Sequence, residues 1–161
     1  MVDAALRERA LAALADVTDP EIPVLTIADL GILRDVSVTD GVVEVTITPT
    51  YSGCPAMNMI TLDIEAALAR AGIEARVRTS LSPAWTTDWL SEAARHKLAA
   101  FGIAPPENST SRRALFGETH PTCPRCGSGR TELISEFGST ACKSLHRCLA
   151  CREPFDAFKC H

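Results

Sequence analysis

The sequence lacks any long hydrophobic run, and its first two thirds contain a single cysteine, Cys54. No stretch of about 18 or more apolar residues occurs, so no transmembrane helix is predicted. The first residues, MVDAALRERALAALADV, carry Asp3 and Glu8 within a helical pattern, which is unlike a secretory signal peptide. The chain is therefore expected to be cytoplasmic and not to associate with a membrane. In that reducing compartment, the seven cysteines are expected to be metal ligands or reactive thiols rather than disulfides. An odd number of cysteines agrees with this, because they cannot all pair within one chain.

Positive charge and histidine are also scarce in the first part of the chain. Residues 1–111 hold 15 acidic and 8 basic side chains, whereas residues 112–161 hold 5 acidic and 8 basic ones. This change in the balance of acidic and basic residues favours a larger domain with a small appendage. Neither part has the basic helix with interleaved aromatic residues that nucleic-acid binding would need. No histidine precedes His96, which argues against a hydrolase with Cys54 as nucleophile, although His96 or a residue of the tail is left open as a base.

The larger part is predicted to be an α/β (α+β) domain, a small mixed three-stranded sheet with flanking helices. Helices are expected at residues 3–16, 55–71 and 88–101, and strands at residues 32–39, 42–48 and 74–81. Asp40 and Gly41 form a two-residue hairpin loop, so the first two strands should be antiparallel neighbours. The strand, helix and strand that follow predict a parallel crossover.

Cys54 lies in the stretch TYSGCP, between the second strand and the helix after it. The predicted topology brings this loop to the same sheet edge as the loop SPAWTTD and the turn that contains Asp19, Pro20 and Glu21. Cys54 is expected at the N-cap and Pro55 at the first helical position. The helix dipole lowers the pKa of a thiol at the N-cap, so the pKa of Cys54 is expected to be low. Cys54 is then a soft nucleophile or a single open metal ligand, with Asp19 and Glu21 as candidate neighbours. The alternatives are a buried, inert thiol and two acids that only form a turn.

Six cysteines fall within the last 39 residues. The stretches CPRCG and CLAC form two C-x2-C pairs separated by 21 residues, which is the pattern of a zinc ribbon. The predicted zinc ligands are Cys123, Cys126, Cys148 and Cys151. A segment this short buries little apolar surface, so the metal is expected to contribute folding free energy directly. Cys142 and Cys160 are possible additional ligands that would support iron or an iron–sulfur cluster, and burial within the ribbon is the alternative favoured for them.

The segments DPEIPVLTIADLGILRDVSV and TPTYSGCPAMNMI resemble the small domain shared by SufT and the cytosolic iron–sulfur targeting factors. Together with SPAWTTDWLSEAARHKLAAFGIAPP and the cysteine tail, the chain resembles the PaaD component, also called PaaJ, of the phenylacetyl-CoA epoxidase system. This resemblance implies an accessory protein rather than an enzyme, one that helps to mature the multicomponent monooxygenase of aerobic phenylacetate catabolism. It also implies that the reactive cysteine of the family corresponds to Cys54, and its acidic motif to Asp19, Pro20 and Glu21.

The prediction is therefore a SufT-like iron–sulfur assembly domain at 1–103, a linker at 104–120 and a zinc-ribbon-like domain at 121–161. The leading hypothesis is a maturation protein that holds iron or an iron–sulfur cluster transiently at Cys54, because a single thiolate gives no stable site. The alternative is a redox or electron-transfer component that carries iron or an iron–sulfur cluster in its cysteine tail. Expected partners are the reductase or oxygenase subunits of the monooxygenase and the iron–sulfur assembly machinery. A homodimer is left open.

Overall fold

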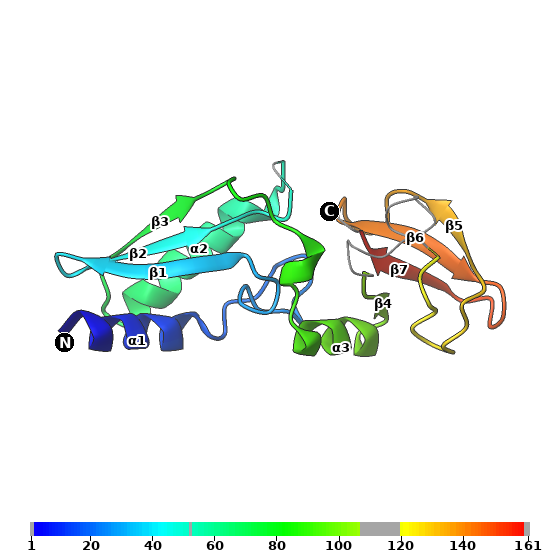
Figure 1. Ribbon diagram of the computed structural model, residues 1–161, viewed down its shortest axis with the longest axis horizontal. Coiled ribbons are helices and arrows are strands. Elements are labelled where there is room, and N and C mark those ends of the chain that lie inside the picture. The colour runs from blue at the N-terminus through cyan, green and yellow to red at the C-terminus, as the bar shows by residue number, and fades with distance from the viewer. Residues whose placement is uncertain (1, 52, 107–119, 160–161) are drawn as a thin grey trace. The chain divides into compact units, whose positions relative to one another are not determined.

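The computed structural model describes residues 2–51, 53–106 and 120–159. The chain forms two compact units, Met1–Trp85 (unit 1) and Thr86–His161 (unit 2), and each has its own β-sheet. Figure 1 shows their elements. None of the helices in the described parts of the chain combines the length and the hydropathy that crossing a bilayer requires.

Unit 1 is built on a three-stranded sheet. Its elements are α1 (Val2–Leu14), β1 (Leu33–Thr39), β2 (Val42–Ile47), α2 (Ala56–Arg70) and β3 (Ala75–Thr79). The strand order is β1-β2-β3, with β1 antiparallel and β3 parallel to the central strand (Figure 1). The turn residues Asp40 and Gly41 both adopt positive φ, as a tight hairpin loop requires. The predicted mixed three-stranded sheet is confirmed.

One face of this sheet forms the core of unit 1. Alternate strand residues, such as Val43, Val45 and Ile47, are fully buried, while α1 and α2 pack against the sheet and against each other. From α2, the buried residues are Ala56, Ile60, Ile64, Ala67 and Leu68. Glu44 and Arg78 project from the other face, where their charged groups lie 3.7 Å apart. Because a shift by one residue would exchange the two faces, this burial pattern fixes the strand register.

The segment between α1 and β1 is irregular but packs into the same core. Its buried apolar residues are Val17, Ile22, Leu25, Ile27, Leu30 and Ile32. The backbone N–H of Asp19 donates to the carbonyl oxygen of Leu25 at 2.9 Å, and that of Ile27 donates to Val17 at 2.9 Å. These contacts hold the acidic turn in a defined position relative to the sheet.

Unit 2 contains a four-stranded sheet preceded by two helical segments. Its elements are η1 (Thr87–Trp89, a 3-10 helix), α3 (Glu92–Ala100), β4 (Ile103–Ala104), β5 (Thr131–Ser135), β6 (Lys143–Cys148) and β7 (Pro154–Phe158). The strand order is β4-β7-β6-β5, in which β4 runs parallel to β7 and the other neighbours are antiparallel. The strands expected of a ribbon between the cysteine pairs are therefore present.

The single helix that the sequence predicts over residues 88–101 is wrong, because the structure divides it into η1 and α3. Leu90 is extended, with φ −66° and ψ 130°, and this interrupts the helical backbone. Ser91 then caps α3, since its hydroxyl oxygen accepts a hydrogen bond from the Ala94 N–H at 3.0 Å. Thr87, which directly precedes the predicted helix, lies buried within η1.

The boundary that the sequence places after residue 103 stays a prediction. In the structure, the two compact units divide after Trp85, so that α3 belongs with the second sheet. Ile103 and Ala104 pair with Asp156 and Ala157 of β7. Most of the predicted linker, like Cys160, lies outside the described residues.

Candidate functional site

Cys54 lies at the end of the loop that joins β2 to α2. Its N–H donates to the carbonyl oxygen of Tyr51 at 3.1 Å, and its own carbonyl oxygen accepts from the Met57 N–H at 3.4 Å. Pro55 occupies the N-cap position with helical dihedral angles, φ −69° and ψ −19°. The predicted N-cap position of Cys54 is therefore wrong by one residue, although the side chain still lies at the start of the helix. The thiol is neither fully buried nor fully exposed.

The expected low pKa of the Cys54 thiol is also wrong, because the structure raises this pKa above its ordinary value. Partial burial is the largest cause, since it disfavours the charged thiolate. A hydrogen bond from the Ala56 N–H acts in the opposite direction, but the negative charges of Glu21 and Asp19 raise the pKa further. The Cys54 thiol is therefore mainly protonated at neutral pH.

The same electrostatic effects show that the acidic turn and the thiol lie near each other. Asp19 and Glu21 are separated from Cys54 by more than 30 residues, yet both carboxylates act on its thiol. Two contacts bring the segment after β3 to this part of unit 1: the Ser80 N–H donates to the Ile47 carbonyl at 2.9 Å, and Trp85 contacts the segment before β1. The convergence predicted from the topology is therefore present.

Asp19 also has a structural role in the acidic turn. Its Oδ1 accepts hydrogen bonds from the N–H groups of Glu21 at 2.7 Å and Ile22 at 3.0 Å, and its side chain is buried. This is the turn-forming function that an Asp before Pro commonly has. Glu21 is partly exposed, so its carboxylate is the more accessible of the two.

Sequence reasoning did not identify Thr50 as part of this site. The Thr50 side chain hydrogen-bonds with the Cys54 thiol, which lowers the thiol pKa slightly against the effect of burial. Thr50 is itself buried. A buried threonine four residues before a cysteine has no distinctive pattern, so the sequence offers no signal for this contact.

The four predicted zinc ligands come together in unit 2. The sulfur atoms of Cys123, Cys126, Cys148 and Cys151 all lie within 4.8 Å of one another. The Sγ atoms of Cys123 and Cys151 are 3.8 Å apart, and those of Cys126 and Cys148 are 3.5 Å apart. Zinc–sulfur bonds of about 2.3 Å in a tetrahedron require sulfur atoms about 3.8 Å apart, so the four thiols fit this ion.

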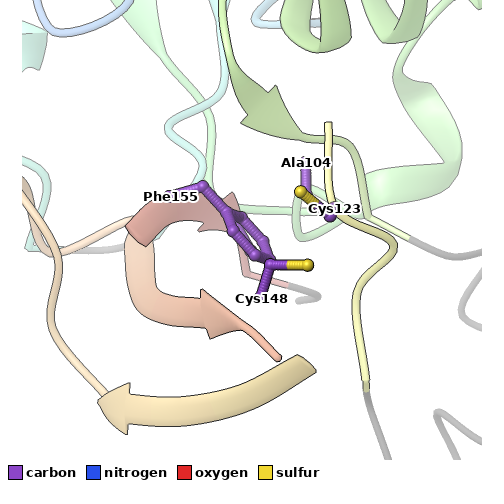
Figure 2. Packing of buried hydrophobic residues seen from close by; sticks show 5 residues of the cluster. Ala104, Cys123, Cys148 and Phe155 are labelled. Carbon is purple, nitrogen blue, oxygen red and sulfur yellow. The ribbon is translucent and has the colours of Figure 1, made fainter. Parts of the chain in front are cut away.

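Two tight turns present these sulfur atoms. In the first, the Gly127 N–H donates to the Cys123 carbonyl oxygen at 3.0 Å, and Gly127 has φ +76°. In the second, the Cys148 N–H donates to the Glu153 carbonyl oxygen at 3.0 Å, and the Cys151 N–H approaches the Cys148 sulfur at 3.5 Å. Figure 2 shows Cys123 and Cys148 on the inner side of the ribbon beside Phe155. The site is therefore partly enclosed by apolar side chains.

Two of the four thiols, Cys148 and Cys151, have shifted pKa values. Hydrogen bonds, first from the Cys151 N–H, lower the pKa of Cys148 to about 6. For Cys151, a hydrogen bond from the Glu153 N–H lowers the pKa, but burial and the neighbouring thiols outweigh it and raise the pKa to about 11. The thiolate is thus favoured at Cys148 and disfavoured at Cys151, and a bound cation would favour it at both.

The other candidate ligands of the tail lie differently. Cys142 is buried and is not part of the four-cysteine group, and its thiol lies 3.0 Å from the Thr140 hydroxyl. Cys160 lies outside the described residues. His146 is buried and stacks on Phe155, and burial lowers its pKa. An additional ligand role for Cys142 or Cys160 stays a prediction.

Two family descriptions match this chain over its two parts. Residues 7–79 match the family described as an iron–sulfur cluster assembly protein. Residues 107–159 match the family described as a PaaD zinc beta ribbon domain. The first match contains the acidic turn and Cys54, and the second contains all four clustered cysteines.

Curated relatives show the same combination. The chain is 50% identical over 150 residues, 92% of its length, to a protein of Escherichia coli K12 that is named as a candidate subunit of 1,2-phenylacetyl-CoA epoxidase, of which it covers 90%. It is 35% identical over 63% of its length to the Fe-S protein maturation auxiliary factor YitW of Bacillus subtilis 168, of which it covers 99%.

A solved structure agrees with the fold of unit 1. The crystal structure of a DUF59 domain of unknown function from Bacillus anthracis superposes with a TM-score of 0.57 at 28% identity, over 61% of this chain and 95% of that one. The chain belongs to the family of the PaaD proteins of the phenylacetyl-CoA epoxidase system, in which an iron–sulfur cluster assembly domain is combined with a zinc ribbon.

Proposed function

We propose that this protein is an accessory factor of the phenylacetyl-CoA monooxygenase and that it assists the assembly of an iron–sulfur or di-iron cofactor through Cys54. The observation that carries the proposal is the partly exposed Cys54 thiol, whose pKa responds to the carboxylates of Asp19 and Glu21. A sulfur beside carboxylates is a donor set that suits iron. The names of the relatives, one a component of an epoxidase and the other an iron–sulfur maturation factor, support the same role.

The raised pKa of the thiol suits transient binding of a cationic cargo. Without cargo, Cys54 keeps its proton, since both burial and the nearby carboxylates oppose the thiolate. Binding of ferrous iron or a cluster to the sulfur releases this proton to solvent, because the positive charge then favours the thiolate. A single thiolate does not hold a metal stably, so the cargo can leave for a protein with more ligands. Glu21, the more exposed carboxylate, is the proposed second donor.

The four-cysteine site of unit 2 has a different role in this proposal. Cys123, Cys126, Cys148 and Cys151 are the proposed ligands of a zinc ion that stabilises the ribbon, since their sulfur spacing fits a closed tetrahedral site. A structural zinc with four protein ligands has no open position for chemistry. Unit 2 would then serve structure or docking, while the cargo is handled in unit 1.

A second candidate function is electron transfer by iron in unit 2, because four thiolates at this spacing also accommodate a rubredoxin-type iron. Metal analysis of protein purified without oxygen, together with its visible spectrum, separates the two candidates. Zinc is colourless, whereas ferric iron bound by thiolates absorbs visible light, so the spectrum is also recorded after oxidation of the sample. Stoichiometric iron in the four-cysteine site would favour the second candidate.

The proposal is tested by producing the oxygenase and reductase subunits of the cognate monooxygenase together with this protein or its Cys54→Ser variant. The iron content and activity of the purified monooxygenase are expected to fall severalfold with the variant. Asn58→Ser, an exposed change in the first turns of α2, is the matched control and should leave both unchanged. If Cys54→Ser supports the same iron content and activity as the parent, the proposed role of the thiol is refuted.

A further inference from the structure

The exposed side of α2 carries apolar residues that begin next to Cys54. With 3.6 residues per helical turn, Pro55, Met59, Leu62 and Ala66 lie along one line, which we call the α2 stripe. All four are exposed, and the exposed fractions of the two largest side chains are 50% for Met59 and 58% for Leu62. The residues of α2 that pack into the core lie on the other side of the helix. The helix therefore has two apolar faces, and within unit 1 only one of them is covered.

The position of the α2 stripe relates it to the proposed cargo site. A helix rises about 1.5 Å per residue, so Leu62 lies only about 10 Å along the axis from Pro55, which directly follows Cys54. A protein that covers Met59 and Leu62 would therefore extend to the thiol. Large apolar side chains that are exposed next to one another are typical of an interaction surface, whereas single scattered ones are ordinary surface residues.

The charges beside the α2 stripe indicate what kind of protein would fit it. Successive residues of a helix are rotated by about 100°, which places Asp63 on one side of the stripe and Glu65 on the other. Both are exposed, and α2 has no basic residue before Arg70. A complementary partner would present an apolar centre with lysine or arginine on its borders. A second copy of this chain is a poorer match, because acidic residues of both copies would then border one interface.

We propose that the α2 stripe is the docking surface for the protein that receives the cargo of Cys54, and that this recipient presents an apolar surface bordered by basic residues. The inference rests on the function proposed for Cys54 and adds the position and chemistry of the contact. Docking along α2 places the recipient beside the Cys54 sulfur. The cargo then moves only a short distance from Cys54 to its ligands in the recipient. The charged borders make association faster at low salt concentration.

The test measures binding of the full-length chain to purified oxygenase and reductase subunits of the cognate phenylacetyl-CoA monooxygenase, prepared without iron. The double variant Met59→Glu/Leu62→Glu is expected to bind its recipient about tenfold to hundredfold more weakly, since buried apolar anchors dominate such interfaces. The double variant Asp63→Lys/Glu65→Lys should also weaken binding and reduce its dependence on salt. Val2→Glu is the matched control, because Val2 is an apolar residue of α1 that is 82% exposed, and it should bind like the parent.

Cys54→Ser separates this inference from the proposed function. The variant is expected to bind the recipient as the parent does but to deliver no iron, whereas the Met59→Glu/Leu62→Glu variant should retain iron binding at Cys54 and lose delivery. Unchanged binding by the Met59→Glu/Leu62→Glu variant would overturn the docking surface even if Cys54 proved essential. Failure of all subunits to bind the parent chain would overturn it as well. The docking surface would also be overturned if the parent chain formed a homodimer that the Met59→Glu/Leu62→Glu variant separates into monomers.

Discussion

The indole nitrogen of Trp85 donates a hydrogen bond to the carbonyl oxygen of Leu30 at 2.7 Å, and both residues are buried. This contact joins the segment after β3 to the segment before β1, which carries the acidic turn. Trp85→Phe removes the indole N–H, so the Leu30 carbonyl oxygen loses this hydrogen bond. A buried polar group that loses its partner costs about 1–3 kcal/mol, so the free energy of unfolding of unit 1 should fall by about that amount.

Urea denaturation followed by circular dichroism measures this effect in the full chain. Trp89→Phe is the control, since Trp89 is only partly buried and belongs to unit 2. Equal stability of the Trp85→Phe variant and the parent would mean that the hydrogen bond does not help to hold the two segments together.

The two acidic residues of the turn are expected to differ in their effect on stability. Asp19→Ala removes the oxygen that accepts from two backbone N–H groups, and hydrogen bonds to a charged acceptor contribute about 1.5–3 kcal/mol. We therefore expect a loss of about that size for Asp19→Ala, a smaller loss for Asp19→Asn, and little change for Glu21→Gln. Chemical denaturation of the three variants checks the order. Equal stability of Asp19→Ala and Glu21→Gln would contradict the structural role of Asp19.

The raised pKa of Cys54 predicts a slow reaction of its thiol at neutral pH. Because the thiolate is the reactive form, iodoacetamide should alkylate Cys54 more slowly at pH 7 than it alkylates free cysteine, and the rate should rise about tenfold per pH unit below the pKa. Glu21→Gln removes a negative charge that raises this pKa, so it should lower the pKa and speed alkylation at pH 7. Mass spectrometry, with Cys54→Ser as the blank, follows the modification of this residue. Alkylation faster than that of free cysteine would show that the start of α2 outweighs burial and the carboxylates.

Removal of the metal from the four-cysteine site is expected to unfold unit 2 and to leave unit 1 folded. Unit 1 has its own apolar core, whereas the described apolar cluster of unit 2 around the site is small: Ala104, Cys123, Cys148, Phe155 and Ala157. Zinc binding at structural sites contributes about 10–16 kcal/mol, which this small core does not replace. Cys126→Ser should have the same effect as a chelator.

Two-dimensional NMR spectra measure this outcome residue by residue, and Cys142→Ser is the control, since Cys142 lies outside the four-cysteine group. Loss of the β5, β6 and β7 signals with retained signals from β1, β2 and β3 is expected. A ribbon that stays folded in Cys126→Ser would contradict a stabilising role of the metal.

Much of this architecture follows from local patterns in the sequence. Val43, Val45 and Ile47 alternate with polar residues, and Asp40-Gly41 suits a tight hairpin loop, so the antiparallel pairing of β1 and β2 could be predicted. The spacing of the two C-x2-C pairs likewise identified the four cysteines that meet in space. In both cases the residues that cause the structure lie within a short stretch of the chain.

Other features depend on residues that are distant in sequence. The pKa of Cys54 is set by burial and by two carboxylates more than 30 residues away, and the local helix effect gave the wrong sign. The two-residue strand β4 exists only because β7 offers it a partner, and the local sequence did not predict the break in the helix at Leu90. No periodicity records such contacts, so the structure was needed to find them.

The order of strands in unit 2 affects the way this protein is made. β7 lies between β4 and β6, so the sheet lacks one of its two inner strands until Phe158 has been added to the growing chain. Unit 1 contains no residue beyond Trp85. At about 5–20 residues per second, ribosomes need about 4 to 15 seconds to translate from one point to the other. Cys54 and the rest of unit 1 are therefore synthesised seconds before the sheet of unit 2 is complete.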